Sequence, residues 1–156
     1  MSISIVKQYS IFLINEPGTL KNFTELFVRE KIDIIAMAQD VRYDAAVVRL
    51  AIQDDKGISH LLTKAGFTSV KTDAICLDIP NRVGILRDVG AVMASHGINI
   101  TTFYGTSDKA GMTRWIIVVN DITQALNALE SSGLFDDWLT LNEKALENQG
   151  LLLLEE

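Results

Sequence analysis

The sequence contains a single cysteine, two histidines and no long apolar run, and these shortages exclude several classes of protein. Cys76 alone cannot form a disulfide within the chain. The first residues lack the basic stretch and the apolar run of a secretory signal, and no apolar run approaches the length of a membrane span. The sequence therefore predicts a cytoplasmic protein without a membrane partner.

A surplus of basic residues is missing too. The 14 Lys and Arg residues are outnumbered by 20 Asp and Glu, the net charge is −6, and the basic residues form no stripe along the chain. Nucleic-acid binding needs such a stripe to neutralise phosphates, so we predict no nucleic-acid partner. What the chain does have is 48 % apolar and 22 % charged residues, the composition of a packed globular protein.

Side chains that could converge into a catalytic or metal site are scarce. His60 and His96 lie far apart in the sequence, and we interpret both as solvated. Cys76 has no histidine near it and is expected to be a small buried hydrophobe. Trp115 and Trp138 lie outside basic surroundings and are expected to pack in a core or an interface. We therefore predict no enzyme activity, no metal and no cofactor.

A repeat with an offset of 66 positions organises the chain. At this offset residues 15–20 fall on residues 81–86 without a gap, and residues 31–34 fall on residues 97–100. After one inserted residue the offset becomes 67 for the remainder of the match. A period of this length is too long for a solenoid unit and indicates a duplicated small domain.

Each copy is predicted to fold in the order βαββαβ. Strand-like runs bounded by turn residues occupy 8–14, 32–40, 45–53 and 67–71 in the first copy, and 73–79, 98–106, 112–119 and 139–141 in the second. Apolar residues at helical spacing predict a first helix through Leu20, Phe23 and Phe27, and its counterpart through Leu86, Val89 and Met93. Second helices are predicted over 55–65 and 121–132, each ending at a glycine, Gly66 or Gly133.

This order is the split-βαβ plan, in which two helices cover one face of an antiparallel sheet. We predict an α+β fold of two ferredoxin-like βαββαβ repeats, residues 1–71 and 72–142, followed by a tail, 143–156. Joining the two sheets edge to edge would close one exposed edge of each. The uncovered faces would still attract a second chain, so we expect a homodimer. The leucine run 151–154 is expected to dock on the partner or on the first copy rather than fray.

The segment Asn-x-(Pro/Val)-Gly-x-Leu recurs where the first strand of each copy meets the first helix. Glycine lets the backbone approach a ligand closely, and free N–H groups at a helix N-terminus attract a carboxylate. Asn15 and Asn81 could cap these helices, which is the favoured interpretation of an asparagine before a helix, or offer an amide to a ligand. Asn99, at the start of the second strand, could face the same cleft.

Strand, turn, amphipathic helix and the following Gly-Ile-Asn-Ile strand together resemble the ACT domain, a small regulatory module of amino-acid metabolism. The resemblance covers about residues 6–142 as two copies, and the second copy matches better. In that family an amino-acid effector binds at an interface between modules, at the first strand–helix turn and the start of the second strand. The resemblance implies the following ligand-binding residues: Asn81, Arg82, Val83, Gly84, Ile85, Leu86, Asn99 and Ile100 in the second copy, and Asn15, Glu16, Pro17, Gly18, Thr19, Leu20, Asp33 and Ile34 in the first.

Two departures from the family pattern suggest that the two sites are unequal. Val83 stands where the motif usually has proline, which keeps the turn plausible. Asp33 replaces the asparagine of the second strand and would repel a ligand carboxylate unless it meets the ammonium group of the ligand.

The function implied by the resemblance is that of a stand-alone regulatory, allosteric protein that binds a free amino acid at module interfaces and signals to a regulated enzyme. One alternative is a structural or protein-interaction module without a ligand. A remote alternative is an acylphosphatase-like hydrolase, because Arg82 or Arg87 with Asn99 mimics the arginine and asparagine of those enzymes. The glycine-spaced phosphate loop of such enzymes is not present in the sequence.

Overall fold

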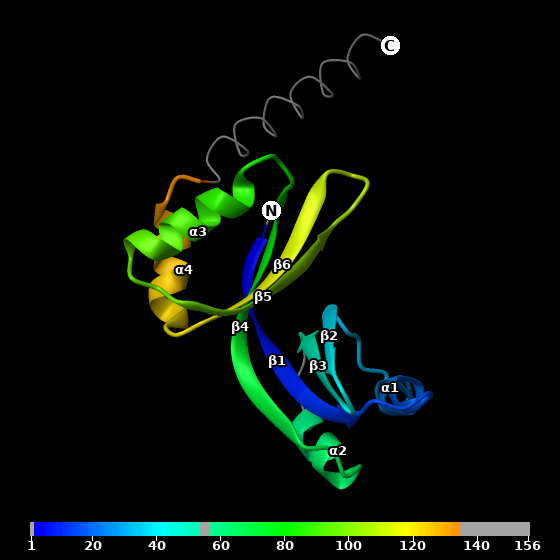
Figure 1. Ribbon diagram of the computed structural model, residues 1–156. Helices are drawn as coiled ribbons and strands as arrows, with labels where there is room; N and C mark the ends of the chain where they lie inside the picture. The colour runs from blue at the N-terminus through cyan, green and yellow to red at the C-terminus, as the bar shows by residue number, and fades with distance from the viewer. Residues whose placement is uncertain (1, 54–56, 135–156) are drawn as a thin grey trace, which may run out of the picture.

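A computed structural model of the chain describes residues 2–53 and 57–134, which form a single antiparallel sheet and four helices (Figure 1). The elements are β1 (Ser2–Ile14), α1 (Thr19–Arg29), β2 (Ala36–Arg42), β3 (Ala45–Ile52), α2 (Ile58–Lys64), β4 (Ser69–Pro80), α3 (Ile85–Ser95), β5 (Ile100–Ser107), β6 (Met112–Val119) and α4 (Ile122–Ser131). The six described strands follow the order β2-β3-β1-β4-β6-β5 across the sheet. This confirms the predicted α+β class with its antiparallel sheet.

Two long strands, β1 and β4, form the centre of the sheet. Their antiparallel pairing runs from Ser2 opposite Asp78 to Ile11 opposite Ser69. The sequence predicted two strands, 67–71 and 73–79, where the structure has the continuous β4. The chain from 69 to 78 contains no glycine or proline that would interrupt a strand, and each of these residues has a partner in β1. β1 begins at Ser2 and not at residue 8, because residues 2–7 also have partners in β4.

The N-terminal part of β1 completes the second half of the sheet. In the ferredoxin-like order the fourth strand of a repeat lies beside its first strand. The first strand of the second half is the part of β4 from residue 73 to 78. Residues 2–7 of β1 occupy this place. The predicted fourth strand, 139–141, lies outside the described residues, as do Trp138 and the leucine run 151–154. The boundary predicted between residues 71 and 72 falls inside β4.

The four helices cover one face of the sheet as two pairs, which Figure 1 shows at its two ends. Along β1, Ile3 packs with the core under α3 and α4, whereas Tyr9 and Ile11 belong to the core under α1 and α2. These residues alternate with residues of the other face, so both helix pairs lie on the same side. Among the described residues, no helix is long and apolar enough to cross a membrane.

The predicted helical stripes are largely confirmed. Phe23 and Phe27 are buried on α1, as are Val89 and Met93 on α3. The assignment of Leu86 to the stripe is wrong, because its side chain is 54 % exposed. The neighbouring Ile85 takes this place, four residues before Val89, which keeps the spacing of one helix face.

The opposite face of the sheet, which we call the open face, carries no helix but has a small core of its own. Val6, Ala74, Cys76 and Ile116 are almost fully buried there. Partly buried residues from both halves of the chain pack against this core. They are Tyr104 of β5, residue 35, which precedes β2, and residue 36, the first of β2. The prediction that Cys76 is a buried small hydrophobe is confirmed.

Candidate functional site

The two turns predicted to bind a ligand share an unusual backbone. Gly18 precedes α1 with a φ of 88°, and Gly84 precedes α3 with a φ of 91°. Residues with a Cβ rarely adopt this left-handed conformation, which explains why glycine recurs. A Cβ at Gly18 would have no neighbour within 4 Å, so the glycine serves the backbone conformation and not a close approach within the chain.

The asparagines of the turns do not cap the helices, so the capping interpretation is wrong. Neither α1 nor α3 has a side-chain hydrogen bond at its N-cap. The Asn15 side-chain amide instead donates to the carbonyl of Tyr43 at 3.1 Å, and the Asn81 backbone N–H donates to the carbonyl of Gly111 at 2.7 Å. Each turn is thereby held against the hairpin loop of its own half, β2–β3 or β5–β6.

The second turn is exposed to solvent on one side and packs against the α3–α4 core on the other. Asn81, Arg82 and Val83 are exposed, with Val83 fully so. Ile85 is only 5 % exposed and belongs to the α3–α4 core, so its side chain cannot face a ligand on the surface. Leu86 is the apolar side chain of this helix start that remains exposed.

The strand residues predicted to accompany the second turn are fixed elsewhere. The Asn99 backbone N–H donates to the side-chain oxygen of Asn120 at 2.8 Å, and its carbonyl accepts from the Asn120 backbone. Ile100 packs partly buried against the α3–α4 core. No hydrogen bond or ion pair joins Asn99 to the Asn81 turn within the described residues, although both side chains are exposed.

The first turn shows the same division into exposed and packed residues. Glu16 and Pro17 are exposed, Thr19 is half-buried, and Leu20 packs against the α1–α2 core. Ile34 also packs against this core. The strand predicted from residue 32 begins only at Ala36, so Asp33 and Ile34 precede β2.

The two arginines of the second turn are held by one carboxylate. Arg82 binds Asp88 at 2.8 Å and Arg87 binds it at 2.7 Å. These bonds, first from Arg87 and then from Arg82, lower the pKa of Asp88 below its ordinary value. The pairing gives both guanidinium groups a carboxylate partner on α3, which argues against the phosphate-binding role required of an acylphosphatase-like site.

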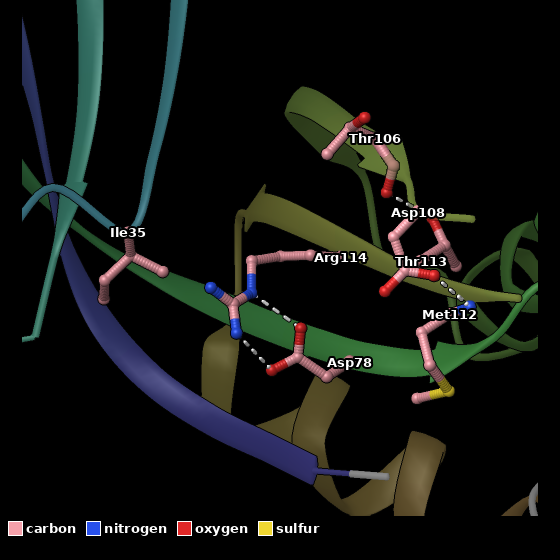
Figure 2. A pocket seen from close by; sticks show the side chains of 7 residues that line it. All are labelled: Ile35, Asp78, Thr106, Asp108, Met112, Thr113 and Arg114. Atoms are coloured by element: carbon pink, nitrogen blue, oxygen red, sulfur yellow. Dashed lines mark hydrogen bonds and ion pairs between the residues drawn. The ribbon is translucent and has the colours of Figure 1, made fainter. Parts of the chain in front are cut away.

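Sequence reasoning did not identify a cavity that lies on the open face and has a volume of about 470 Å³. We call it the open-face cavity (Figure 2). Its lining comes from both halves of the chain: Ile35, Asp78, Thr106, Asp108, Met112, Thr113 and Arg114. One signal was present in the sequence, because Asp78 interrupts the apolar stretch 74–80 of β4 and Arg114 is the charged residue of the mostly apolar β6.

An ion pair between neighbouring strands forms the floor of the open-face cavity. Arg114 of β6 donates from Nε to Oδ1 of Asp78 at 2.7 Å and from Nη2 to Oδ2 at 3.0 Å. The hydrogen bond from Arg114 lowers the pKa of Asp78. The pKa of Arg114 is raised, chiefly by this bond and in smaller part by the charge of Asp33. Asp33 of the first half therefore lies near a cation of the second half.

The remaining polar groups of the cavity are arranged around the β5–β6 hairpin. The Thr113 hydroxyl donates to the carbonyl of Thr106 at 2.9 Å. The carboxylate of Asp108 accepts from the backbone N–H of Met112 at 2.8 Å. Only one oxygen of Asp108 is used in this bond, so its second oxygen can accept from a ligand.

The histidines and the described tryptophan occupy the environments that the sequence predicted. His60 and His96 are both exposed. Trp115 is 7 % exposed and packs in the α3–α4 core against Phe103, with ring centroids 5.2 Å apart. Within residues 2–53 and 57–134, no group of three or more His, Cys, Asp or Glu is placed to hold a metal ion.

Comparison with known proteins finds a family match within the second half of the chain. Residues 75–131, from the middle of β4 to the end of α4, match the model of the ACT domain family. This stretch is therefore similar to an ACT domain. No curated protein matches the sequence.

Solved structures share the fold over most of the chain. Protein BT0572 from Bacteroides thetaiotaomicron has a TM-score of 0.75 at 24 % identity, over 83 % of this chain and 90 % of that one. The ligand-free regulatory subunit of aspartate kinase from Thermus thermophilus has a TM-score of 0.64 at 16 % identity, over 83 % and 93 %. The aspartate kinase of Clostridium acetobutylicum has a TM-score of 0.56 at 15 % identity, over 87 % of this chain but 34 % of the enzyme. At these identities the likeness establishes the fold alone.

Proposed function

We propose that the chain is a regulatory protein that binds a free amino acid through two ACT-like modules in tandem, residues 1–71 and 72–142. The observation that carries this proposal is the match of residues 75–131 to the ACT domain model. The fold is also shared with a regulatory subunit of aspartate kinase, although at low identity. A regulatory role needs no catalytic residues in this chain, and the signal would pass to a partner enzyme.

Backbone geometry supports a second module in the first half. Lys31 has a φ of 54°, which is rare for a residue with a side chain, and Gly97 has a φ of 66° at the position 66 residues later. Gly18 and Gly84 repeat in the same way at the helix starts. Conformations repeated at equal spacing, even where the residue type differs, favour a duplicated fold.

The turns 15–20 and 81–86 are the proposed effector sites, with Asn99 and Ile100 or Asp33 and Ile34 beside them. The Thr19 and Ile85 N–H groups already donate to the carbonyls of Glu16 and Arg82. Because no side chain caps α1 or α3, the N–H groups of the second and third residues of each helix can bind the carboxylate of an amino acid. The exposed Asn81 side chain could donate to the same group. The buried Ile85 would support the turn without touching the ligand.

Assembly into a homodimer belongs to the same proposal. The open face carries three apolar side chains that are at least half exposed: Phe12 and Ile14 in the part of β1 that pairs with β3, and Val70 in the first part of β4. The edge strands β2 and β5 also leave backbone groups unpaired within the described sheet. Apolar surface and open edges of this kind favour association with a second chain.

A thermal-shift screen of the purified protein against each of the 20 standard amino acids tests the proposal. A ligand that binds only the folded state stabilises it by about 2.7 kcal/mol at 100 times its Kd. We expect a selective rise in Tm that is smaller in Asn81→Ala. The exposed Asn127→Ala on α4 serves as the matched control and should respond like the wild type.

A module that only binds other proteins is the second candidate function. The fully exposed Val83 and the half-exposed Leu86 favour it, because apolar side chains at a turn suit a protein surface as well as a ligand. Tm values unchanged by every amino acid would contradict the sensor and favour this candidate.

A further inference from the structure

We infer that the open-face cavity is a further amino-acid site, in which Arg114 binds the ligand carboxylate and the acidic residues Asp78 and Asp108 bind its ammonium group. The ligand class rests on the proposed function, but the location does not. The cavity shares no lining residue with the turns or with Asn99 and Asp33.

Arg114 has donors left for a ligand. A guanidinium group carries five N–H donors, and Asp78 takes one from Nε and one from Nη2. Figure 2 shows the remaining nitrogen pointing away from Asp78 toward Ile35, which lies across the cavity. Asp78 holds the guanidinium plane by two bonds, so the free donors have a fixed direction and can meet a carboxylate at little cost in side-chain entropy.

The charges around the cavity select a ligand that also carries a positive group. Asp78 and Asp108 line it, and the charge of Asp33 acts on Arg114 from the first half. Two carboxylates thus line the cavity beside one guanidinium, and the charge of a third acts on that guanidinium, an arrangement that favours a ligand with a positive group over a simple anion. An amino acid brings an ammonium group for Asp78 or Asp108 together with the carboxylate for Arg114.

The size and walls of the cavity suit a small ligand that touches both halves of the chain. Its volume of about 470 Å³ lies within the usual range of small-molecule pockets. Met112 supplies apolar surface from the second half and Ile35 from the first. A ligand bound between them would favour one arrangement of the two halves, which is the requirement for a regulatory effect.

The test is isothermal titration calorimetry, which measures the Kd of whichever standard amino acid gives the largest thermal shift. It compares the wild type, the double variant Asn15→Ala/Asn81→Ala, which weakens both turns, and the same double variant with Arg114→Gln or Asp108→Asn added. We expect the double variant to bind still, and each added substitution to weaken this binding about tenfold or more, as for the loss of a charged hydrogen bond. Adding Arg29→Gln, on α1 of the other sheet face, should change nothing.

The outcomes separate this inference from the proposed function. If the wild type binds and the double variant does not, or if Arg114→Gln and Asp108→Asn bind like their parent, the cavity site is wrong and amino-acid binding stands. If the wild type binds no amino acid, both proposals fail. Asp108 is exposed and Asn keeps the bond to the Met112 N–H, so Asp108→Asn decides the matter even if Arg114→Gln does not fold.

Discussion

At the scale of single residues, the repeated glycines are explained by backbone conformation. Sequence reasoning recognised that Gly18 and Gly84 recur but assigned them to close approach by a ligand. The structure gives both a left-handed φ, and an added Cβ would meet no atom within 4 Å at Gly18 and only the flexible Arg87 side chain, at 3.9 Å, at Gly84. A local motif thus indicated which residues matter, whereas the reason depended on dihedral angles that a sequence pattern does not specify. The same limit made the capping interpretation of Asn15 and Asn81 wrong.

The conformation of Gly84 predicts the effect of adding a Cβ. We expect Gly84→Ala to lower the free energy of unfolding by about 1–2 kcal/mol, the cost of a left-handed residue with a side chain. Gly90→Ala, inside α3, is the matched control, because its φ is not positive and its Cβ would meet no neighbour. Helix propensity predicts a gain of about 0.5–1 kcal/mol there. Urea denaturation measures both, and equal effects would contradict the explanation.

The Asp78–Arg114 pair predicts a dependence of stability on pH. Arg114 lowers the pKa of Asp78 in the folded state, so the stabilisation is present above the ordinary Asp pKa of 3.8 and is lost as pH falls through the lower folded value. We expect Asp78→Asn to be less stable than the wild type at pH 7 by roughly 1 kcal/mol. The difference should shrink below pH 4. Urea denaturation from pH 7 to pH 3 checks this, and a constant difference would argue against the charge pair.

At the scale of elements, locally determined structure was predicted well and long-range pairing was not. The strands predicted over 45–53 and 112–119 agree within a residue with β3 and β6, and the helix predicted over 121–132 agrees with α4. Periodicity and turn glycines define these elements from nearby residues. The N-terminal extension of β1 has its partners more than 60 residues away in β4, so no local pattern indicated it.

The open-face core predicts that truncation to alanine destabilises the fold to different extents at two neighbouring residues of β1. Val6 is 1 % exposed on the helix-free face, whereas Ile5 on the helix-covered face is 47 % exposed in the space between the helix pairs. Loss of apolar burial should cost about 1–2 kcal/mol for Val6→Ala. Ile5→Ala removes more atoms and should still cost less. A larger loss for Ile5→Ala in urea denaturation would show that the open face is not a second core.

At the scale of the whole molecule, the two halves are joined through shared central strands. The first residues of the chain lie beside the second half of β4, and the open-face cavity takes residues from both halves. A cavity assembled in this way could not be found from motifs, because Ile35 and Arg114 are 79 positions apart and neither belongs to a recognisable pattern. The same arrangement gives a bound ligand a route to influence the whole sheet.

Amide hydrogen exchange of the wild type, with and without a mixture of the 20 standard amino acids at millimolar concentration, tests the central claim most directly. Amino-acid binding predicts slower exchange at residues 81–86 and in the strands that line the open-face cavity, with smaller changes in the exposed part of α2. Exchange rates that are the same with and without amino acids at every amide would contradict the claim that this chain is an amino-acid sensor.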